Sequence, residues 1–203
     1  MFRKTLAAAA GACCLVAINV QAQTMSAKFP TNTKTVWLHT AMPTGCDSPL
    51  VRAVNTWNAQ PVNFNWQFDA AANLTGSRWY SGDSRYVIED GTTSSASAHA
   101  STYRAATGTI GQVHTVVKAE HLWYNNDESG GRFYCSATAG TTPSTKYDYQ
   151  TTMTHELGHA LGMDDGGAST CVMYGYQGMG TAGQRRSLCS TEATSFKNAY
   201  GAG

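Results

Sequence analysis

The sequence predicts an α+β domain in which most of the strands precede the two later helices. Apolar and polar residues alternate at 34–40 and 62–68, which is the period of a β-strand, and 85–89 is interpreted as a third strand. Two later segments, 148–161 and 190–200, have the composition of helices, and a glycine directly follows each of them. With 203 residues and no internal repeat or linker, the chain suits one domain.

The first helix is expected to begin at Asp47 or Ser48, with Pro49 in its first turn, and to run to about residue 59. Its apolar residues recur at three- and four-residue steps, so one face should be buried. These residues are Leu50, Val51, Val54 and Trp57.

The middle of the chain is predicted to complete the sheet. Residues 91–109 are rich in serine, threonine, alanine and glycine, and we expect a loop there with a thin edge strand at 98–103. The apolar residues of 112–123 predict a further strand, and 125–144 has the composition of a turn-rich connection.

The charge balance argues against two classes of partner. Charged residues make up 13% of the chain, and the formal net charge is +1. Nucleic acids and anionic membrane surfaces attract proteins with a basic excess, which this chain lacks. We therefore expect no nucleic-acid partner.

The beginning of the chain has the features of a signal peptide. A basic start is followed by a short apolar run at 6–20 and by small residues before Gln23, which predicts a signal over 1–22. The run is shorter than the ~20 residues that a membrane span needs. A lipoprotein signal at Cys13 is the alternative. We expect one domain at 23–203, secreted to the extracellular space or the periplasm, with no membrane contact after cleavage.

Four cysteines remain after the predicted signal: Cys46, Cys135, Cys171 and Cys189. In an oxidising compartment they would form two disulfides, with three possible connectivities. We favour Cys171–Cys189 with Cys46–Cys135, because the first closes a glycine-rich loop at a gain of about 3 kcal/mol. No Cys-x-x-Cys pair occurs among these four residues, which disfavours a zinc site built from cysteines.

The segment Thr154-His-Glu-Leu-Gly-His-Ala-Leu-Gly-Met-Asp-Asp165 carries the chemistry. Residues four apart share one face of a helix, so His155 and His159 can hold one metal ion. Glu156 lies beside them and could take a proton from a zinc-activated water and pass it to a leaving amine.

Two histidines leave a catalytic zinc one protein ligand short. Gly162 can adopt the positive φ that ends a helix sharply, and Asp165 follows three residues later. An aspartate there would complete three protein ligands and leave a fourth position for water. A purely structural zinc would leave Glu156 without a role, so we favour a hydrolytic site.

This motif resembles the signature of the metzincin clan of metallopeptidases, His-Glu-x-x-His-x-x-Gly-x-x-His/Asp followed by a methionine turn. Asp165 in place of a third histidine is typical of the snapalysins, a family of small extracellular neutral proteases. The spacing of Cys171, Met173 and Cys189 and the ending Asn198-Ala-Tyr-Gly201 are similar to that family as well. The resemblance is strong over the last third of the chain and diffuse before it.

The resemblance implies a twisted, mostly parallel five-stranded sheet with an active-site helix, a backing helix and a C-terminal helix. Substrate would lie antiparallel to the edge strand at 98–103, and Met173 would form the floor beneath the metal. In other metzincins a tyrosine two residues past the methionine approaches the metal. Gly175 stands there in this chain, so Tyr176, ahead of Tyr174, is the candidate oxyanion or substrate contact.

A second metal is not expected. Ser97-Ala-His-Ala-Ser101 faintly resembles the matrixin edge strand, in which such a histidine binds a structural zinc, and His114 could be its partner. The His-x-Asp sequence that would complete that site is absent. We therefore expect one catalytic zinc ion and no second structural metal.

The predicted function is that of a secreted, monomeric zinc-dependent endopeptidase acting on proteins or peptides. Two alternatives stay open. The same chemistry could hydrolyse the peptide amides of a cell wall, or the chain could be a secreted zinc-binding module without turnover. The presence of Glu156 favours catalysis.

Overall fold

The computed structural model describes six segments of the chain, namely residues 23–40, 42–68, 86–95, 97–104, 107–119 and 132–203. The predicted signal peptide lies outside these residues. So do Arg85 and residues 120–123, the ends of two predicted strands.

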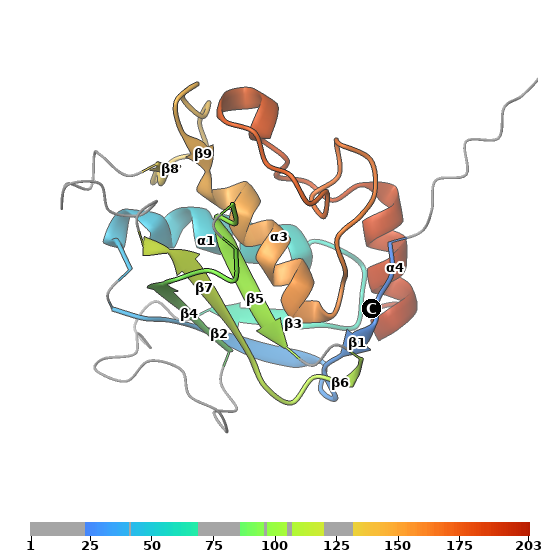
Figure 1. The fold of residues 1–203 in the computed structure, drawn as a ribbon. Coiled ribbons are helices and arrows are strands. Elements are labelled where there is room, and N and C mark those ends of the chain that lie inside the picture. The colour runs from blue at the N-terminus through green and yellow to red at the C-terminus, as the bar shows by residue number, and fades with distance from the viewer. Residues whose placement is uncertain (1–22, 41, 69–85, 96, 105–106, 120–131) are drawn as a thin grey trace, which may run out of the picture.

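The main sheet has five strands in the order β3-β2-β4-β7-β5 (Figure 1). Their bounds are Thr33–Leu38 for β2, Asn65–Phe68 for β3, Tyr86–Gly91 for β4, Ala100–Arg104 for β5 and Val113–Lys118 for β7. All neighbouring pairs are parallel except β5 with β7. The expected mostly parallel five-stranded sheet is confirmed, and the predicted edge strand is β5.

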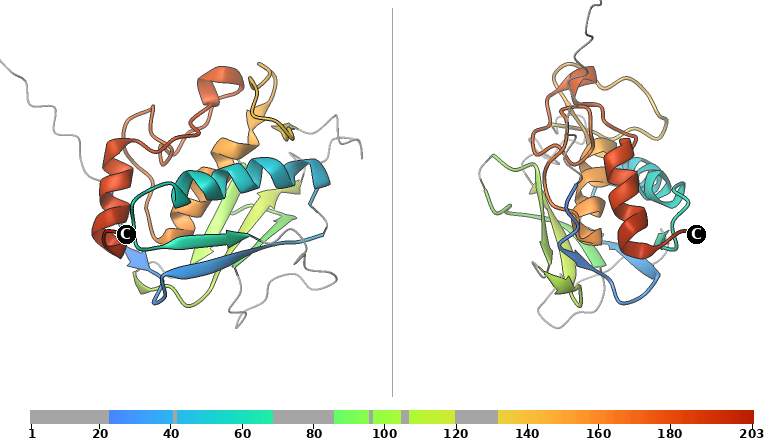
Figure 2. Two further views of the ribbon diagram at one scale, coloured as in Figure 1. Left: turned by 180° about the vertical axis from the view of Figure 1, so that it is seen from behind. Right: turned by 90° about the vertical axis from the view of Figure 1, so that its right-hand side faces the viewer.

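Within the described residues, three α-helices accompany the sheet. They are α1 (Asp47–Asn58), α3 (Tyr149–Leu161) and α4 (Ser190–Tyr200). Helices α1 and α3 pack against each other on one face of the sheet, where α1 contacts β3 and α3 contacts β5 (Figures 1 and 2). Helix α4 stands at one end of this layer (Figure 2). The backing, active-site and C-terminal helices expected from the resemblance are thus present, which confirms the predicted fold class.

Short elements complete the architecture. Two small parallel pairs join β1 (Ala27–Lys28) to β6 (Gly108–Thr109) and β8 (Phe133–Tyr134) to β9 (Tyr147–Asp148). Among the described residues, short 3-10 helices lie at η1 (Thr44–Cys46) and η3 (Gly180–Gly183).

Helix α1 corrects two details of the sequence prediction. Its N-cap is Cys46 rather than Asp47 or Ser48. Val51 is 36% exposed, whereas Ala53 is fully buried. The buried stripe follows three- and four-residue steps from Leu50, and a residue one position further along turns about 100° away from it.

An aromatic core fixes α3 between its neighbours. Trp57 of α1 is fully buried, and its indole Nε1 donates to the carbonyl of Thr154 at 2.9 Å. The ring of Phe196 from α4 meets Trp57 edge-on, with centroids 5.2 Å apart. Trp57 of α1 thereby holds the segment of α3 that precedes the His-Glu motif, and α4 packs against Trp57.

Both disulfides form as expected. Cys46 pairs with Cys135, and Cys171 pairs with Cys189. The first joins the start of α1 to the chain that leads into β9, and the second joins the loop after α3 to the start of α4. Within the described segments, no helix is both long and apolar enough to cross a membrane.

Candidate metal centre

The N-cap of helix α3 is Asp148, a buried residue whose carboxylate accepts several hydrogen bonds. The Asp148 carboxylate accepts hydrogen bonds from the Thr151 amide at 2.8 Å, from the Thr142 hydroxyl at 2.7 Å and from the guanidinium of Arg186. Burial alone would raise the pKa of Asp148, but these hydrogen bonds, Arg186 first, hold it below the ordinary value. A fixed N-cap sets the rotation of the helix and therefore the direction of its histidines.

The helix ends at Gly162, as the sequence predicts. Its φ is +105°, and a β-carbon there would lie 1.8 Å from the carbonyl oxygen of Ala27. Glycine is therefore required both by backbone conformation and by the close approach of the N-terminal segment. The chain reverses at this point and returns Asp165 toward the helix.

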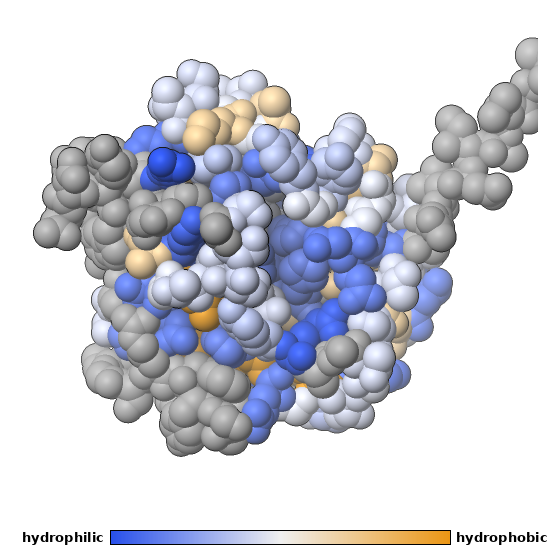
Figure 3. Space-filling view, viewed as in Figure 1, coloured by the Kyte–Doolittle hydropathy of each residue, from blue (hydrophilic) through white to orange (hydrophobic). Residues whose placement is uncertain are grey.

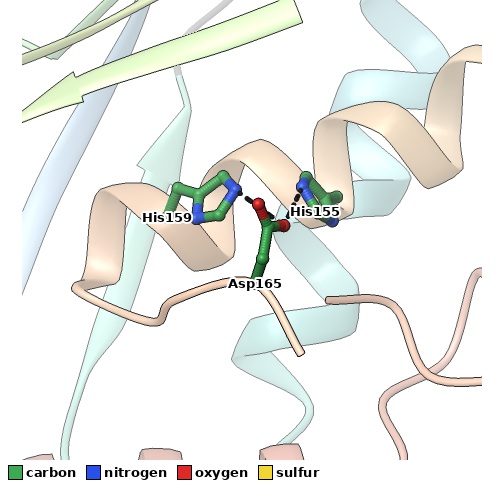
Figure 4. A group of neighbouring side chains, drawn as sticks. All are labelled: His155, His159 and Asp165. Carbon is green, nitrogen blue, oxygen red and sulfur yellow. Dashed lines mark ion pairs between the residues drawn. The ribbon is translucent and has the colours of Figure 1, made fainter. Parts of the chain in front are cut away.

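His155, His159 and Asp165 converge, the two histidines from α3 and the aspartate from the loop that follows it (Figure 4). Their ligand atoms all lie within 4.8 Å of one another. Asp165 Oδ1 is 3.3 Å from His155 Nε2 and 3.4 Å from His159 Nε2. Ligands about 2.0–2.1 Å from a tetrahedral zinc lie about 3.3–3.4 Å apart, so the donor set and its spacing fit zinc.

Backbone carbonyls orient both imidazoles. His155 Nδ1 lies 2.9 Å from the carbonyl of Val172, and His159 Nδ1 lies 2.8 Å from that of Met163. A carbonyl can only accept, so Nδ1 carries the proton in each neutral ring and Nε2 keeps its lone pair for a metal. When both rings are protonated and no metal is bound, they donate hydrogen bonds to Asp165 through Nε2, and these bonds hold the pKa of its carboxyl well below the ordinary value.

Glu156 follows the first histidine and is 5% exposed. Its Oε2 accepts a hydrogen bond of 2.6 Å from the hydroxyl of Thr102 on β5. It lines the same cleft as the three candidate ligands.

Met173 lies beneath the helix, where the resemblance places it. It is fully buried, and a β-carbon on Gly158 would come within 2.4 Å of its sulfur. The glycine between Leu157 and His159 thus leaves room for the thioether. The Met173 amide donates to Glu192 of α4, whose other carboxylate oxygen accepts from the Cys189 amide. The turn is therefore held by α4 as well as by the disulfide.

The candidate ligands open onto a cleft of about 1020 Å³. The cleft is lined by strand β5, by Val172 and by residues 174–177. Hydrophilic side chains gather around the hollow near the middle of this face (Figure 3). Tyr174 and Tyr176 both line the cleft, and they are 37% and 72% exposed. Between them Gly175 lies against Asp165, whose Cγ would be 3.3 Å from a β-carbon there.

The two histidines considered for a second metal are not cross-strand partners. The register of β5 and β7 sets His114 opposite Tyr103, and their rings stack with centroids 4.8 Å apart. His99 instead accepts from the Lys118 amide through its backbone carbonyl, and its ring packs on Tyr147.

Two side chains near the site were missed by the sequence prediction. Arg104, at the end of β5, donates to the carbonyl of His159 and to the Asp164 carboxylate. Thr102 bonds Glu156, as described above. The sequence analysis predicted that this segment is an edge strand along which substrate lies. A single sequence does not reveal which of the strand's side chains face α3.

A helix with two candidate ligand histidines, a glycine turn to a third candidate ligand and a buried methionine turn beneath it define the architecture of metzincin-clan zinc metallopeptidases. A model of the matrixin family matches residues 31–201. The chain therefore belongs to the matrixin family and is a zinc metalloendopeptidase. No curated protein matches it. Its particular closeness to the snapalysins stays a prediction.

Proposed function

We propose that the protein is a secreted endopeptidase in which His155, His159 and Asp165 hold the catalytic zinc and Glu156 is the general base. The observation that carries this proposal is the convergence of three ligand atoms within 4.8 Å of one another beside Glu156. The family supports zinc and the reaction class, and the convergence of the side chains supports this choice of residues.

When bound, zinc supplies a Lewis acid that polarises the scissile carbonyl and lowers the pKa of water toward neutrality. Glu156 takes the proton of the attacking water on its carboxylate and then delivers it to the leaving amine. Since the carboxylate is mostly buried, few solvent molecules compete for this proton.

The substrate binds along β5. Within the described residues, β5 is the last strand of the sheet on the side of the cleft. An extended peptide adds to such a strand through its backbone, which gives broad rather than sequence-specific recognition. Tyr176 is the candidate side chain for contact with substrate, because it lines the cleft and is largely exposed.

The test measures hydrolysis of an unfolded protein by three samples: the purified enzyme, the same enzyme with a chelator, and the Glu156→Ala variant. We expect cleavage by the wild type alone, with zinc still bound to the variant. A wild type that binds one zinc ion and cleaves only cell-wall peptides would shift the assignment to that substrate, and no turnover on either would indicate a binding module.

Secretion is tested separately. N-terminal sequencing of the exported protein should begin at Gln23, and sedimentation should give the mass of a monomer. The two disulfides fit an oxidising compartment. A mature chain that begins elsewhere would revise the boundary but not the site.

A further inference from the structure

Three hydroxyl groups lead from the middle of the sheet to Glu156. The Tyr86 hydroxyl of β4 lies 2.8 Å from Thr115 Oγ1 of β7. Thr115 Oγ1 lies 2.6 Å from Thr102 Oγ1 of β5, and Thr102 Oγ1 lies 2.6 Å from Glu156 Oε2. The chain of contacts thus crosses three neighbouring strands and ends on the carboxylate of the proposed general base.

The register of the sheet makes this alignment possible. Thr102 is directly opposite Thr115 in the antiparallel pair of β5 and β7. Tyr86 is opposite Val113, two residues before Thr115, so its side chain projects from the same face of the sheet. That face is the one on which α3 packs (Figure 1).

The direction of the hydrogen bonds follows from the number of protons. An ionised carboxylate can only accept, so Thr102 must donate to Glu156, and a hydroxyl has one proton to give. Thr115 must then donate to Thr102, and Tyr86 must donate to Thr115. Burial raises the pKa of Tyr86, which keeps the phenol protonated and able to start the series.

These hydroxyls occupy an apolar setting. Tyr86 and Thr115 are both fully buried, as are the neighbouring Ile88, Val113 and Val117. Phenylalanine and valine would fill the two positions without any polar group in need of a partner. Polar groups at such depth are stable only when the whole network is satisfied, and here the network ends at Glu156.

We propose that Tyr86, Thr115 and Thr102 form a one-way hydrogen-bond relay that holds Glu156 by Oε2 and leaves Oε1 for the proton of the attacking water. The three are positioning residues, because they act through Glu156. This inference rests on the proposed role of Glu156 and names the residues that hold it in place.

The first test needs no metal and no activity. Thr102→Val removes the hydroxyl donor but keeps the shape of the side chain. In the zinc-free protein the buried Glu156 carboxylate therefore loses this hydrogen bond. We expect its melting temperature to fall by about 4 °C or more. In a Glu156→Ala background the same substitution should cost much less. Equal losses in the two backgrounds would overturn the relay, since they would show no coupling between the two residues.

The second test is kinetic. Thr102→Val should lower kcat about tenfold with KM and zinc content unchanged, because a misplaced base affects the reaction and not binding. Thr102→Ser, which restores the hydroxyl, should recover most of the loss, and Thr115→Val should lower kcat about threefold. Thr35→Val is the matched control, since its hydroxyl bonds Gln67 on the far side of the sheet.

The outcomes separate the two proposals. A zinc-loaded wild type without turnover refutes the proposed function. The melting temperatures of the zinc-free variants still test the relay in that case. An active wild type whose Thr102→Val variant keeps its full kcat overturns the relay alone. So does a Thr102→Ser variant as slow as Thr102→Val.

Discussion

The guanidinium of Arg104 and the carboxylate of Asp164 form an ion pair, with Nη2 and Oδ1 2.9 Å apart. Arg104 ends the edge strand β5, and Asp164 directly precedes the proposed ligand Asp165. Arg104 also donates to the carbonyl of His159 through Nε. One side chain therefore links the edge strand to both ends of the turn that separates two proposed ligands.

Loss of this link should weaken metal binding. Arg104→Met is expected to lower zinc affinity about 10- to 100-fold, as is usual when a group supporting the ligands is removed. Arg104→Lys should recover little, because an ammonium group lacks the planar fork of donors. Competition with a chromophoric chelator measures the affinity, and Lys197→Met on the exposed side of α4 is the control. An unchanged affinity in Arg104→Met would contradict this role.

Asp148 should make the free energy of unfolding depend on pH. Because folding lowers its pKa, the ionised form stabilises the fold above the ordinary value of 3.8, and this contribution disappears as the pH falls through the lower folded value. Asp148→Asn should therefore cost about 3–5 kcal/mol near neutral pH, since it leaves Arg186 without its partner. In urea unfolding, the difference from wild type should shrink below about pH 4.

Asp47→Asn is the comparison for this pH series. Burial raises the pKa of Asp47, so its ionised form opposes folding, and any pH trend must have the opposite sign. A constant difference between Asp148→Asn and wild type from neutral to strongly acid pH would argue against a lowered pKa at Asp148.

Gly162 offers a test that separates backbone strain from crowding. Gly162→Ala forces a β-carbon both into positive φ and onto the carbonyl of Ala27. Gly108 also has a positive φ, of +80°, but nothing lies within 4 Å of its would-be β-carbon. Gly162→Ala should therefore cost about 1–3 kcal/mol more than Gly108→Ala, and it alone should reduce zinc affinity. Equal unfolding free energies for the two variants would contradict the close approach.

The two disulfides should differ in what they stabilise. Cys46 and Cys135 are 89 residues apart in sequence, and Cys171 and Cys189 are 18 apart. The chain-entropy model gives about 5 kcal/mol for the longer loop and about 3 kcal/mol for the shorter. Paired serine variants should show this order in denaturant unfolding. Only loss of Cys171–Cys189, which brackets Met173, should also weaken zinc binding, and a reversed pattern would refute the assignment.

The three candidate metal ligands could be predicted because they are close in sequence. His155 and His159 face one way by helix geometry alone, and the glycine that ends the helix lets Asp165 return toward it within three residues. The edge strand at 98–103 was predicted within a stretch of uniform composition, and the structure has it at Ala100–Arg104. The spacing of the candidate ligands, by contrast, is a local pattern that a single sequence displays.

The supporting residues could not be predicted in the same way. Thr102 reaches Glu156 only because it is opposite Thr115 across a strand pair, and sequence alone does not give that register. The exposure of Val51 was missed for a related reason. The sequence pattern groups it with the apolar face of α1, but the buried face of the helix is narrower and excludes it. Tertiary contacts decided both cases.

The turn after α3 is joined to the first described residues of the chain. Ser26 donates its amide to the carbonyl of Gly162 at 2.9 Å, and Asp164 donates to that of Thr24 at 3.0 Å. The proposed third ligand is therefore held in place by contacts between two segments that are far apart in sequence. A chain without residues 24–26 would lack these contacts and hold Asp165 less firmly, so its zinc affinity would report whether the two segments are docked on each other.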